Sequence, residues 1–265
     1  MESKLEQLRN NLKKMKKVAV AFSGGLDSTF LAKIANETLN AEAIAITINS
    51  SVFPDWEIEE SKKIASEIGI KQIVVDFDQN EIKGFSNNTK DRCYICKKEL
   101  FSVIIAIAKK NNYNIILDGS TLDDKFDYRP GVKALKELQI ISPLKDLNFT
   151  KKEIRDLSKK IGLSTWNKSS FACLASRFPY GTTITKEELE KIEKAEDFIR
   201  KFGLKQFRVR HHDEIARIEV LKDDFNLILE NSEKIISYFK ELGFNYITLD
   251  IEGYRSGSLN EVLDL

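Results

Sequence analysis

The segment Ser23–Thr29 reads SGGLDST and directly follows a short apolar run, so it could bind an anion. Between a strand and a helix, such a turn points its backbone N–H groups at a phosphate or pyrophosphate. Its two glycines let the backbone approach the anion closely, and its hydroxyl groups add donors. Asp27 is acidic, so it either shares a Mg²⁺ ion with the phosphates or caps the turn. The residues that we assign to this anion site are Ser23, Gly24, Gly25, Leu26, Asp27, Ser28 and Thr29.

Cys93 and Cys96 form a CxxC pair, and Cys173 is the only other cysteine of the chain. Such a pair can be a redox dithiol, half of a zinc site or part of an iron–sulfur site. A Cys₄ zinc site within one subunit would need a fourth cysteine. Three thiolates could instead hold a [4Fe–4S] cluster through three irons, and the open fourth iron could bind an extra sulfide. The simpler alternative makes Cys96 a core residue and the CxxC spacing a coincidence.

Arginines in the C-terminal third of the chain could bind a phosphate monoester. Within FRVRHH, Arg208 and Arg210 share one face of a predicted strand, because side chains alternate along a strand. Arg177 and Arg255 come from predicted loops, and a guanidinium fork binds phosphate oxygens bidentately. Glu219, on the next strand, either balances these charges or helps to hold a metal ion such as Mg²⁺. The alternative is a solvated strand face with ordinary salt bridges.

An alternation of strands and helices must position these groups. The strands are predicted at 17–22, 41–48, 71–77, 113–119 and, more briefly, 140–143. Helical spacing predicts helices between them, among them 28–39 and a helix from near Cys96 to Lys110, and a capping-box pattern at Thr150 and Glu153 starts another. This pattern predicts an α/β fold with a parallel five-stranded sheet and helices on both faces. A ligand is then expected at the carboxyl ends of the strands.

The pattern changes after Trp166. A long stretch without periodicity, 167–185, contains Cys173 and is typical of a functional segment. Beyond it, the order helix, strand, strand, helices, strand predicts a smaller α+β domain. We therefore place a domain boundary near residue 168, between 1–168 and 169–265.

Composition narrows the class of protein. With 265 residues, 42% apolar and 31% charged, the chain is typical of one or two globular domains. Its net charge of +1 argues against a protein held to nucleic acid by bulk charge. Three cysteines do not make a secreted disulfide scaffold, and no apolar run reaches the ~20 residues of a membrane span. The first residues have no apolar core for a signal peptide, so we expect a cytoplasmic protein without a membrane partner.

SGGLDST resembles the pyrophosphate loop, SGGxDS, of the N-type ATP pyrophosphatases, and we call it the PP-loop. That family has the adenine nucleotide alpha hydrolase-like fold. The resemblance implies that ATP loses pyrophosphate while its AMP part activates a carbonyl or carboxylate oxygen, with Mg²⁺ at Asp27. The family also has an acidic turn after the fourth strand, which here matches DGSTLDD (118–124) and DYRPG (127–131). The resemblance therefore adds Gly119, Asp123 and Arg129 to the ATP site.

Four further segments are similar to the LarE family of ATP-dependent sulfur transferases, which build the nickel-pincer nucleotide cofactor of lactate racemase. They are RCYICKKELF (92–101), WNKSSFACLASRFPYGTTIT (166–185), FRVRHH (207–212) and GYRSGSLNE (253–261). The resemblance implies that ATP adenylates the carboxylates of pyridinium-3,5-biscarboxylic acid mononucleotide, and that an enzyme-held sulfur then displaces AMP. It implies a homo-oligomer in which 1–168 binds ATP and 169–265 serves substrate binding and oligomerisation. It places the substrate phosphate near Ser176, Arg177, Arg208, Arg210 and Arg255.

Two versions of this family differ in their sulfur source. One sacrifices a single cysteine, equivalent to Cys173, and leaves dehydroalanine. The other has three cysteines and holds a [4Fe–4S] cluster that delivers sulfide from its open iron. Because Cys93, Cys96 and Cys173 are all present, we favour the cluster version.

Three other functions fit part of the pattern. A tRNA thiolase can also combine a PP-loop with three cluster cysteines, although the net charge and the absence of a recognisable RNA-binding appendage argue against it. An amide-forming ligase, such as an NAD or GMP synthetase, would use ammonia and need no thiols. A nucleotide-binding regulator would release no pyrophosphate with any carboxylate.

Overall fold

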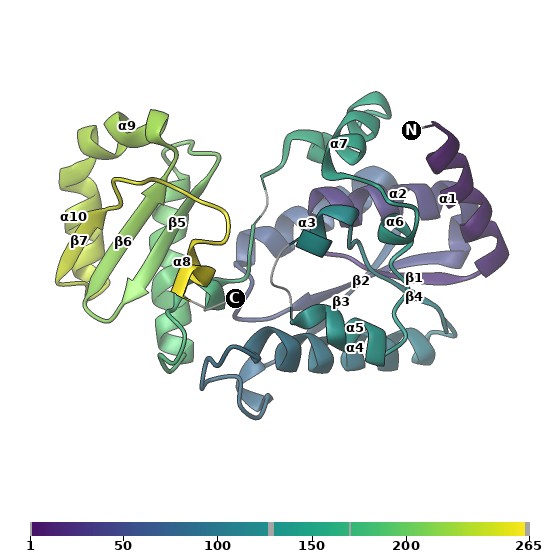
Figure 1. The fold of residues 1–265 in the computed structure, drawn as a ribbon, viewed down its shortest axis with the longest axis horizontal. Coiled ribbons are helices and arrows are strands. Elements are labelled where there is room, and N and C mark those ends of the chain that lie inside the picture. Colours follow the sequence, from purple (N-terminus) through teal and green to yellow (C-terminus); the bar gives the residue numbers. More distant parts are fainter. Residues whose placement is uncertain (1, 127–129, 170, 263–265) are drawn as a thin grey trace. The chain divides into compact units, whose positions relative to one another are not determined.

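The computed structural model describes residues 2–126, 130–169 and 171–262 (Figure 1). The chain divides into two compact units: unit 1 is formed by 1–82 and 93–171, and unit 2 by 83–92 and 172–265. Unit 2 thus takes one short segment from between the two parts of unit 1. The functions that we assign to 1–168 and 169–265 stay predictions.

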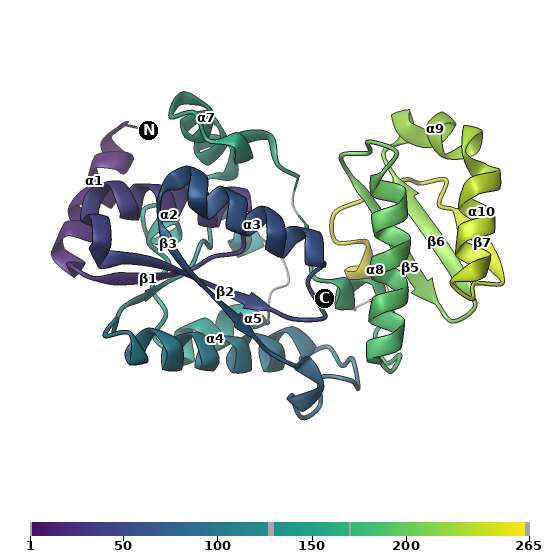
Figure 2. The same cartoon turned by 180° about the vertical axis from the view of Figure 1, so that it is seen from behind.

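Unit 1 is a parallel sheet with helices on both faces (Figures 1 and 2). Its strands β1 (Val18–Ala21), β2 (Ala43–Asn49), β3 (Lys71–Asp76) and β4 (Ile116–Leu117) lie in the order β3-β2-β1-β4. The helices are α1 (Glu2–Met15), α2 (Leu26–Leu39), α3 (Asp55–Ile68), α4 (Arg92–Lys110), α5 (Gly131–Glu137), α6 (Pro143–Asp146) and α7 (Lys151–Lys160). This arrangement confirms the predicted α/β class.

The predicted fifth strand is wrong, because within the described residues this sheet has four strands. At 140–143, Ile141 forms only an isolated parallel bridge with Leu117. The next residues start α6, with Pro143 in its first turn. Proline has no N–H group for a sheet ladder but suits the first turn of a helix, so the apolar run ends before it becomes a strand.

Each face of the sheet has its own apolar core. On one face, α1, α2, α3 and α7 bury residues such as Leu8, Phe30 and Ile154. On the other face, α4 and α5 bury residues such as Ile104 and Leu135. Because both faces are covered, β1 and β4 consist of apolar residues and β2 is largely apolar, as expected for a buried parallel sheet. All the strands run in one direction, so their carboxyl ends meet at one edge, where the PP-loop follows β1.

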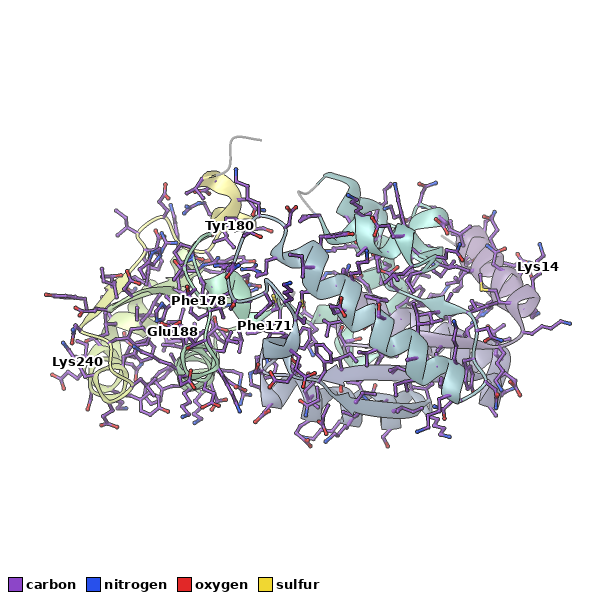
Figure 3. The ribbon with its side chains drawn as sticks, turned by 90° about the horizontal axis from the view of Figure 1, so that it is seen from below. Lys14, Phe171, Phe178, Tyr180, Glu188 and Lys240 are labelled. Atoms are coloured by element: carbon purple, nitrogen blue, oxygen red, sulfur yellow. The ribbon has the colours of Figure 1, made fainter. Side chains whose placement is uncertain are left out.

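Unit 2 contains a mixed sheet of three strands in the order β5-β6-β7 within the described range. The strands are β5 (Phe207–His212), β6 (Ile215–Val220) and β7 (Tyr246–Leu249), and the helices are α8 (Lys186–Arg200), α9 (Phe225–Glu230) and α10 (Ser232–Glu241). β5 and β6 are antiparallel, whereas β6 and β7 are parallel. The order of elements agrees with the predicted α+β pattern. Phe178 (labelled in Figure 3) is fully buried in this unit. Its ring stacks on His211, with the ring centroids 4.9 Å apart.

The short segment 83–92 pairs with the loop that precedes α8. The backbone N–H of Ile184 donates to Ser86 O at 2.9 Å, and that of Gly181 donates to Asn88 O at 3.0 Å. The buried Asn88 side chain donates to Pro179 O at 2.6 Å. The end of the region predicted to be irregular is therefore anchored at Pro179, Gly181 and Ile184 by hydrogen bonds to its backbone. None of the helices in the described ranges combines the length and the apolar character that a membrane span requires.

Candidate active site

The PP-loop is a strand-to-helix turn, as predicted. α2 begins at Leu26, and its N-cap residue Gly25 provides no side-chain cap, so the first N–H groups of the helix face outward. The Ser23 and Ser28 hydroxyl oxygens lie 3.1 Å apart, and Ser28 Oγ donates to Gly25 O. Gly24 has a φ of +69°, and a Cβ there would lie 2.9 Å from Ser61 Cα, so only glycine fits. The loop can therefore bring N–H and hydroxyl donors to a pyrophosphate group.

Asp27 does not cap the turn. Its Oδ1 atom is buried and has no hydrogen-bond partner among the described residues. Burial, the largest cause, raises the pKa of Asp27 to about 6, although Lys151 and Arg155 lower it. A buried carboxylate oxygen without a donor is a ligand that a divalent cation would satisfy. The residues of the loop therefore fit a phosphate group with Mg²⁺ at Asp27.

The acidic turn after β4 lies against the PP-loop. A Cβ on Gly119 would lie 3.0 Å from Ser28 N, so this glycine permits close packing on the first turn of α2. Asp118 is buried and accepts hydrogen bonds from the hydroxyl groups of Ser120 and Ser142. Asp123 accepts from the Lys151 N–H at 2.7 Å, at the start of α7. Of the ATP-site residues predicted in this turn, Arg129 lies outside the described residues.

The CxxC pair lies in the first two turns of α4, which begins at Arg92. This placement was predicted, and a helix N-terminus favours the thiolate form of cysteine. Cys173 belongs to unit 2, whereas Cys93 and Cys96 belong to unit 1, and all three are half-buried. Three thiols are suitable donors for a [4Fe–4S] cluster. However, no group of three or more Cys, His, Asp or Glu side chains that could hold a metal occurs in the described ranges, so the cluster stays a prediction.

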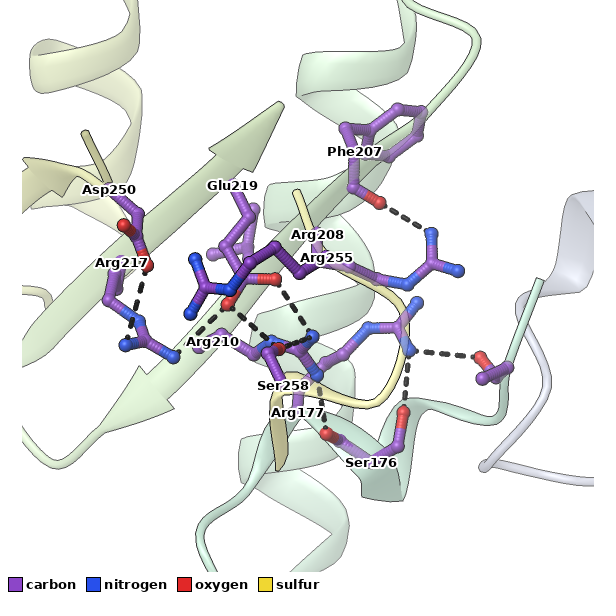
Figure 4. A network of polar contacts seen from close by, with 12 residues as sticks. Ser176, Arg177, Phe207, Arg208, Arg210, Arg217, Glu219, Asp250, Arg255 and Ser258 are labelled. Atoms are coloured by element: carbon purple, nitrogen blue, oxygen red, sulfur yellow. Dashed lines mark hydrogen bonds and ion pairs between the residues drawn. The ribbon is translucent and has the colours of Figure 1, made fainter. Parts of the chain in front are cut away.

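The segment after Cys173 is held by a buried ion pair. Arg177, on the short 3₁₀ turn Leu174–Arg177, donates from Nε and Nη2 to the two carboxylate oxygens of Glu196, at 2.7 and 3.0 Å. Arg177 is fully buried, and Glu196 is 1% exposed. A third donor, Nη1, reaches Ser176 Oγ at 2.7 Å (Figure 4). It also reaches the Cys173 carbonyl at 3.3 Å. The guanidinium fork of Arg177, which we assigned to a substrate phosphate, is thus bound to Glu196. The same guanidinium group fixes the backbone beside Cys173.

Arg208 and Arg210 share one face of β5, as predicted, and both are buried (Figure 4). Arg210 donates to Glu219 Oε2 at 2.8 Å and to Ser176 O at 2.8 Å. Glu219 also accepts from Arg217 at 3.1 Å. The carboxylate that we considered for Mg²⁺ is therefore paired with two guanidinium groups. Burial and then the positive charge of Arg177 lower the pKa of Arg208 to about 10. The Arg208 guanidinium donates to the Phe207 carbonyl and lies over the Tyr254 ring, 5.2 Å from its centroid.

The remaining predicted phosphate ligands differ in their environment. Ser176 is half-buried, and its hydroxyl donates to the Cys173 carbonyl at 2.8 Å. Arg255 is paired with Glu252 at 2.7 Å and with Glu261 at 3.1 Å, both of them exposed. Ser176 therefore belongs to the buried arginine network, whereas Arg255 lies at its solvated side.

Glu196 is a site residue that the sequence analysis missed. Leu189, Ile192 and Ile199 share its helix and are buried, and Glu196 interrupts this apolar stripe at helical spacing. A charged residue within a core-facing stripe needs a partner, so its position was a usable signal. Its Oε1 atom also accepts from the Val209 N–H at 2.9 Å. Glu196 thus links α8, β5 and the segment that carries Cys173.

Glu196→Gln is expected to lower the stability of the protein by about 3 kcal/mol, because it leaves the Arg177 charge buried without a carboxylate. Glutamine keeps an oxygen for the Val209 N–H, so the loss reports on the ion pair. Urea denaturation followed by circular dichroism measures this loss of unfolding free energy. The control is Glu190→Gln, an exposed position on the same helix. Equal midpoints for the two variants would mean that the pair contributes nothing.

The fold and the PP-loop define the class of the protein. Residues 17–164, more than half of the chain, match the family described as arginosuccinate synthase N-terminal HUP domain. This match accounts for the parallel sheet and for the anion-binding turn after β1. The protein is therefore an ATP-utilising enzyme with a PP-loop domain.

Relatives that match nearly the whole chain define the family. The pyridinium-3,5-bisthiocarboxylic acid mononucleotide synthase of Lactiplantibacillus plantarum is 38% identical over 95% of this chain and 92% of its own. An uncharacterised protein of Synechocystis is 40% identical over 99% of both chains. A tRNA-specific 2-thiouridylase of Fusobacterium nucleatum is 31% identical, over 61% of this chain and 56% of its own. The chain belongs to the LarE family and is an ATP-dependent sulfurtransferase, rather than an amide-forming ligase or a regulator.

Proposed function

We propose that the enzyme converts the two carboxylates of pyridinium-3,5-biscarboxylic acid mononucleotide to thiocarboxylates, as a step towards the nickel-pincer nucleotide cofactor. The observation that carries this proposal is the match, over 95% of the chain, to a synthase named for the bisthiocarboxylic product. Family resemblance further suggests a cytoplasmic homo-oligomer acting on this small molecule. In this proposal 1–168 binds ATP and 169–265 binds the substrate.

The chemistry requires an activated carboxylate. A substrate carboxylate oxygen attacks the α-phosphorus of ATP, the bond to the β-phosphate oxygen breaks, and pyrophosphate leaves. A sulfur nucleophile then attacks the acyl carbon, the carbon–oxygen bond to AMP breaks, and a thiocarboxylate remains. The PP-loop amides and hydroxyls, with Mg²⁺ at Asp27, would stabilise the charge that develops on pyrophosphate.

For the sulfur source, we propose a [4Fe–4S] cluster held by Cys93, Cys96 and Cys173. When bound, such a cluster supplies sulfide from an iron that no cysteine ligates. The alternative is that Cys173 itself gives up its sulfur. The presence of all three cysteines supports the cluster, and so does the helix N-terminus beneath Cys93 and Cys96.

The assay that tests the proposed function is AMP and pyrophosphate formation, followed together with thiocarboxylate by mass spectrometry. We expect formation to depend on the biscarboxylic mononucleotide and to be absent with ammonia or with unmodified tRNA. Nicotinic acid mononucleotide is a matched control, since it carries the same phosphate and one carboxylate. Sulfur incorporation into tRNA instead would make the enzyme a tRNA thiolase.

The buried arginines support a phosphate subsite in unit 2. Arg177, Arg208 and Arg210 are buried, and Arg177 and Arg210 each donate a hydrogen bond to Ser176. Arg217 lies beside this group and pairs with Glu219 at 3.1 Å and with Asp250 at 3.5 Å. We therefore propose that the phosphate of the substrate binds at Arg208 and Arg210 with Ser176, with Arg177 supporting them from beneath and Arg255 at the solvated side.

Arg208→Lys is expected to raise the KM for the mononucleotide roughly tenfold, because one charge-assisted hydrogen bond of the guanidinium fork is lost. The KM for ATP should stay within about twofold, since the change lies outside the PP-loop. Steady-state kinetics with each substrate varied in turn measure both constants, with the exposed Arg200→Lys as the control. An equal rise in the KM for ATP would place Arg208 at the nucleotide instead.

A further inference from the structure

Lys168 is a lysine that the mechanism above does not use, and it lies at the PP-loop. Its ammonium group donates to the Gly24 carbonyl at 3.1 Å and to Glu60 Oε2, on α3, at 3.0 Å. The side chain is only 14% exposed. The PP-loop itself contains no lysine, so Lys168 brings a positive charge to the backbone of the loop from a distant part of the sequence.

Both ends of Lys168 are fixed. Arg155, on α7, donates to the backbone carbonyl of Lys168 at 3.0 Å and to that of Trp166 at 2.9 Å. Glu60 holds the ammonium group from α3. Because the backbone and the head group are both anchored, little entropy remains to be lost when the ammonium binds the Gly24 carbonyl.

The bond to Gly24 sets the orientation of one peptide group. The carbonyl of Gly24 and the N–H of Gly25 belong to the same planar peptide and point in opposite directions. With the carbonyl bound to Lys168, the Gly25 N–H points away from Lys168 and donates to Ser23 Oγ of the loop at 3.3 Å. Gly24 is wedged against Ser61 of α3, so this peptide is held by packing on one side and by Lys168 on the other.

We propose that Lys168 is a positioning residue of the PP-loop. The hydrogen bond from Lys168 to the Gly24 carbonyl fixes the direction of the Gly25 N–H. This N–H lies beside the open N–H groups of α2 and points in the direction in which the pyrophosphate part of ATP binds. This proposal rests on ATP binding at the PP-loop and is independent of the substrate that receives sulfur. Preorganised donors stabilise an anion without a reorganisation cost when charge develops.

The test is calorimetric binding of Mg-ATP, pyrophosphate and AMP to Lys168→Met, which keeps the apolar stem and removes the ammonium. We expect the Kd of ATP and of pyrophosphate to rise about tenfold, because the loop loses a hydrogen bond to a charged group, and that of AMP to stay unchanged. Lys168→Arg should restore part of the affinity. Lys160→Met is the matched control, since Lys160 also pairs with a glutamate but lies far from the loop in an exposed ion pair.

An unchanged Kd for pyrophosphate in Lys168→Met would overturn the proposal. So would an equal loss of AMP affinity, which would indicate general damage to the domain. If Lys168→Met does not fold, Lys168→Arg decides. A Kd for ATP and pyrophosphate that rises less than about tenfold supports the role of the charge, and a rise of about tenfold or more with a normal melting temperature contradicts it. None of these measurements uses the mononucleotide. Their results therefore test the role of Lys168 even if the enzyme acts on another substrate.

Discussion

Asp27→Asn is expected to lower the rate of AMP and pyrophosphate formation at least ~100-fold while the fold is retained. The buried Oδ1 atom of Asp27 has no hydrogen-bond partner within the described residues, and asparagine cannot bind a divalent cation as a carboxylate does. Single-turnover kinetics with radiolabelled ATP measure the chemical step directly. The effect is large because the cation would neutralise charge on the leaving pyrophosphate.

The same substitution is expected to stabilise the ligand-free protein at neutral pH. The pKa of Asp27 is raised from 3.8 to about 6, with burial as its main cause. A raised pKa means that the stabilising contribution of this group is complete below 3.8 and is lost as pH rises through about 6. The melting temperatures of wild type and Asp27→Asn should therefore agree near pH 4, diverge as pH rises toward about 6, and keep a constant difference above that, with the variant higher.

The exposed Asp156→Asn on α7 is the control for both measurements, and it should change neither rate nor melting temperature. Ser28→Ala removes the hydroxyl that bonds to Gly25 O and Ser23 and should also slow pyrophosphate release. Unchanged pyrophosphate release in both Asp27→Asn and Ser28→Ala would contradict the assignment of the PP-loop.

Replacing any one of Cys93, Cys96 and Cys173 with alanine is expected to abolish iron binding and sulfur transfer together. A [4Fe–4S] cluster tolerates few missing ligands, so the loss should be nearly complete in each variant. The measurements are the iron content of the anaerobically purified protein and thiocarboxylate formed per subunit with added sulfide. Ser102→Ala, an exposed position on the same helix as the CxxC pair, is the control and should keep both.

The sacrificial mechanism gives a different pattern. Only Cys173 would be needed for sulfur transfer. Each wild-type subunit would transfer one sulfur atom, and its mass would fall by one H₂S. Full activity of Cys93→Ala, or that loss of mass after reaction, would overturn the cluster and leave membership of the LarE family intact. ATP-dependent adenylation should survive in every cysteine variant, because the PP-loop is unchanged.

The sequence alone determined the elements whose signals are local. The alternation of apolar runs and helical spacing predicted the parallel sheet of unit 1, because each strand and helix carries its own periodicity. The capping box of Thr150 and Glu153 is present at α7, and the PP-loop lies between β1 and α2. Such features depend on neighbours within a few residues, so they are visible before the chain folds.

Pairing between distant segments was decided only by the tertiary structure. The run at 140–143 looks like a strand, yet β4 is two residues long and Ile141 reaches it through a single bridge. The sequence likewise did not indicate that 83–92 joins unit 2. In both cases the partner strand or loop lies far along the chain, and no local pattern specifies its register.

The roles of the charged side chains were also decided only by the tertiary structure. The sequence identified Arg177, Arg208 and Arg210 as a basic group, because their types and spacing suffice for that. It could not show that the fork of Arg177 is bound by Glu196, nineteen residues away. Nor could it show that Lys168 reaches the carbonyl of Gly24. Burial and the identity of the partner decide whether a charge holds the structure or remains available to a ligand, and only folding sets them.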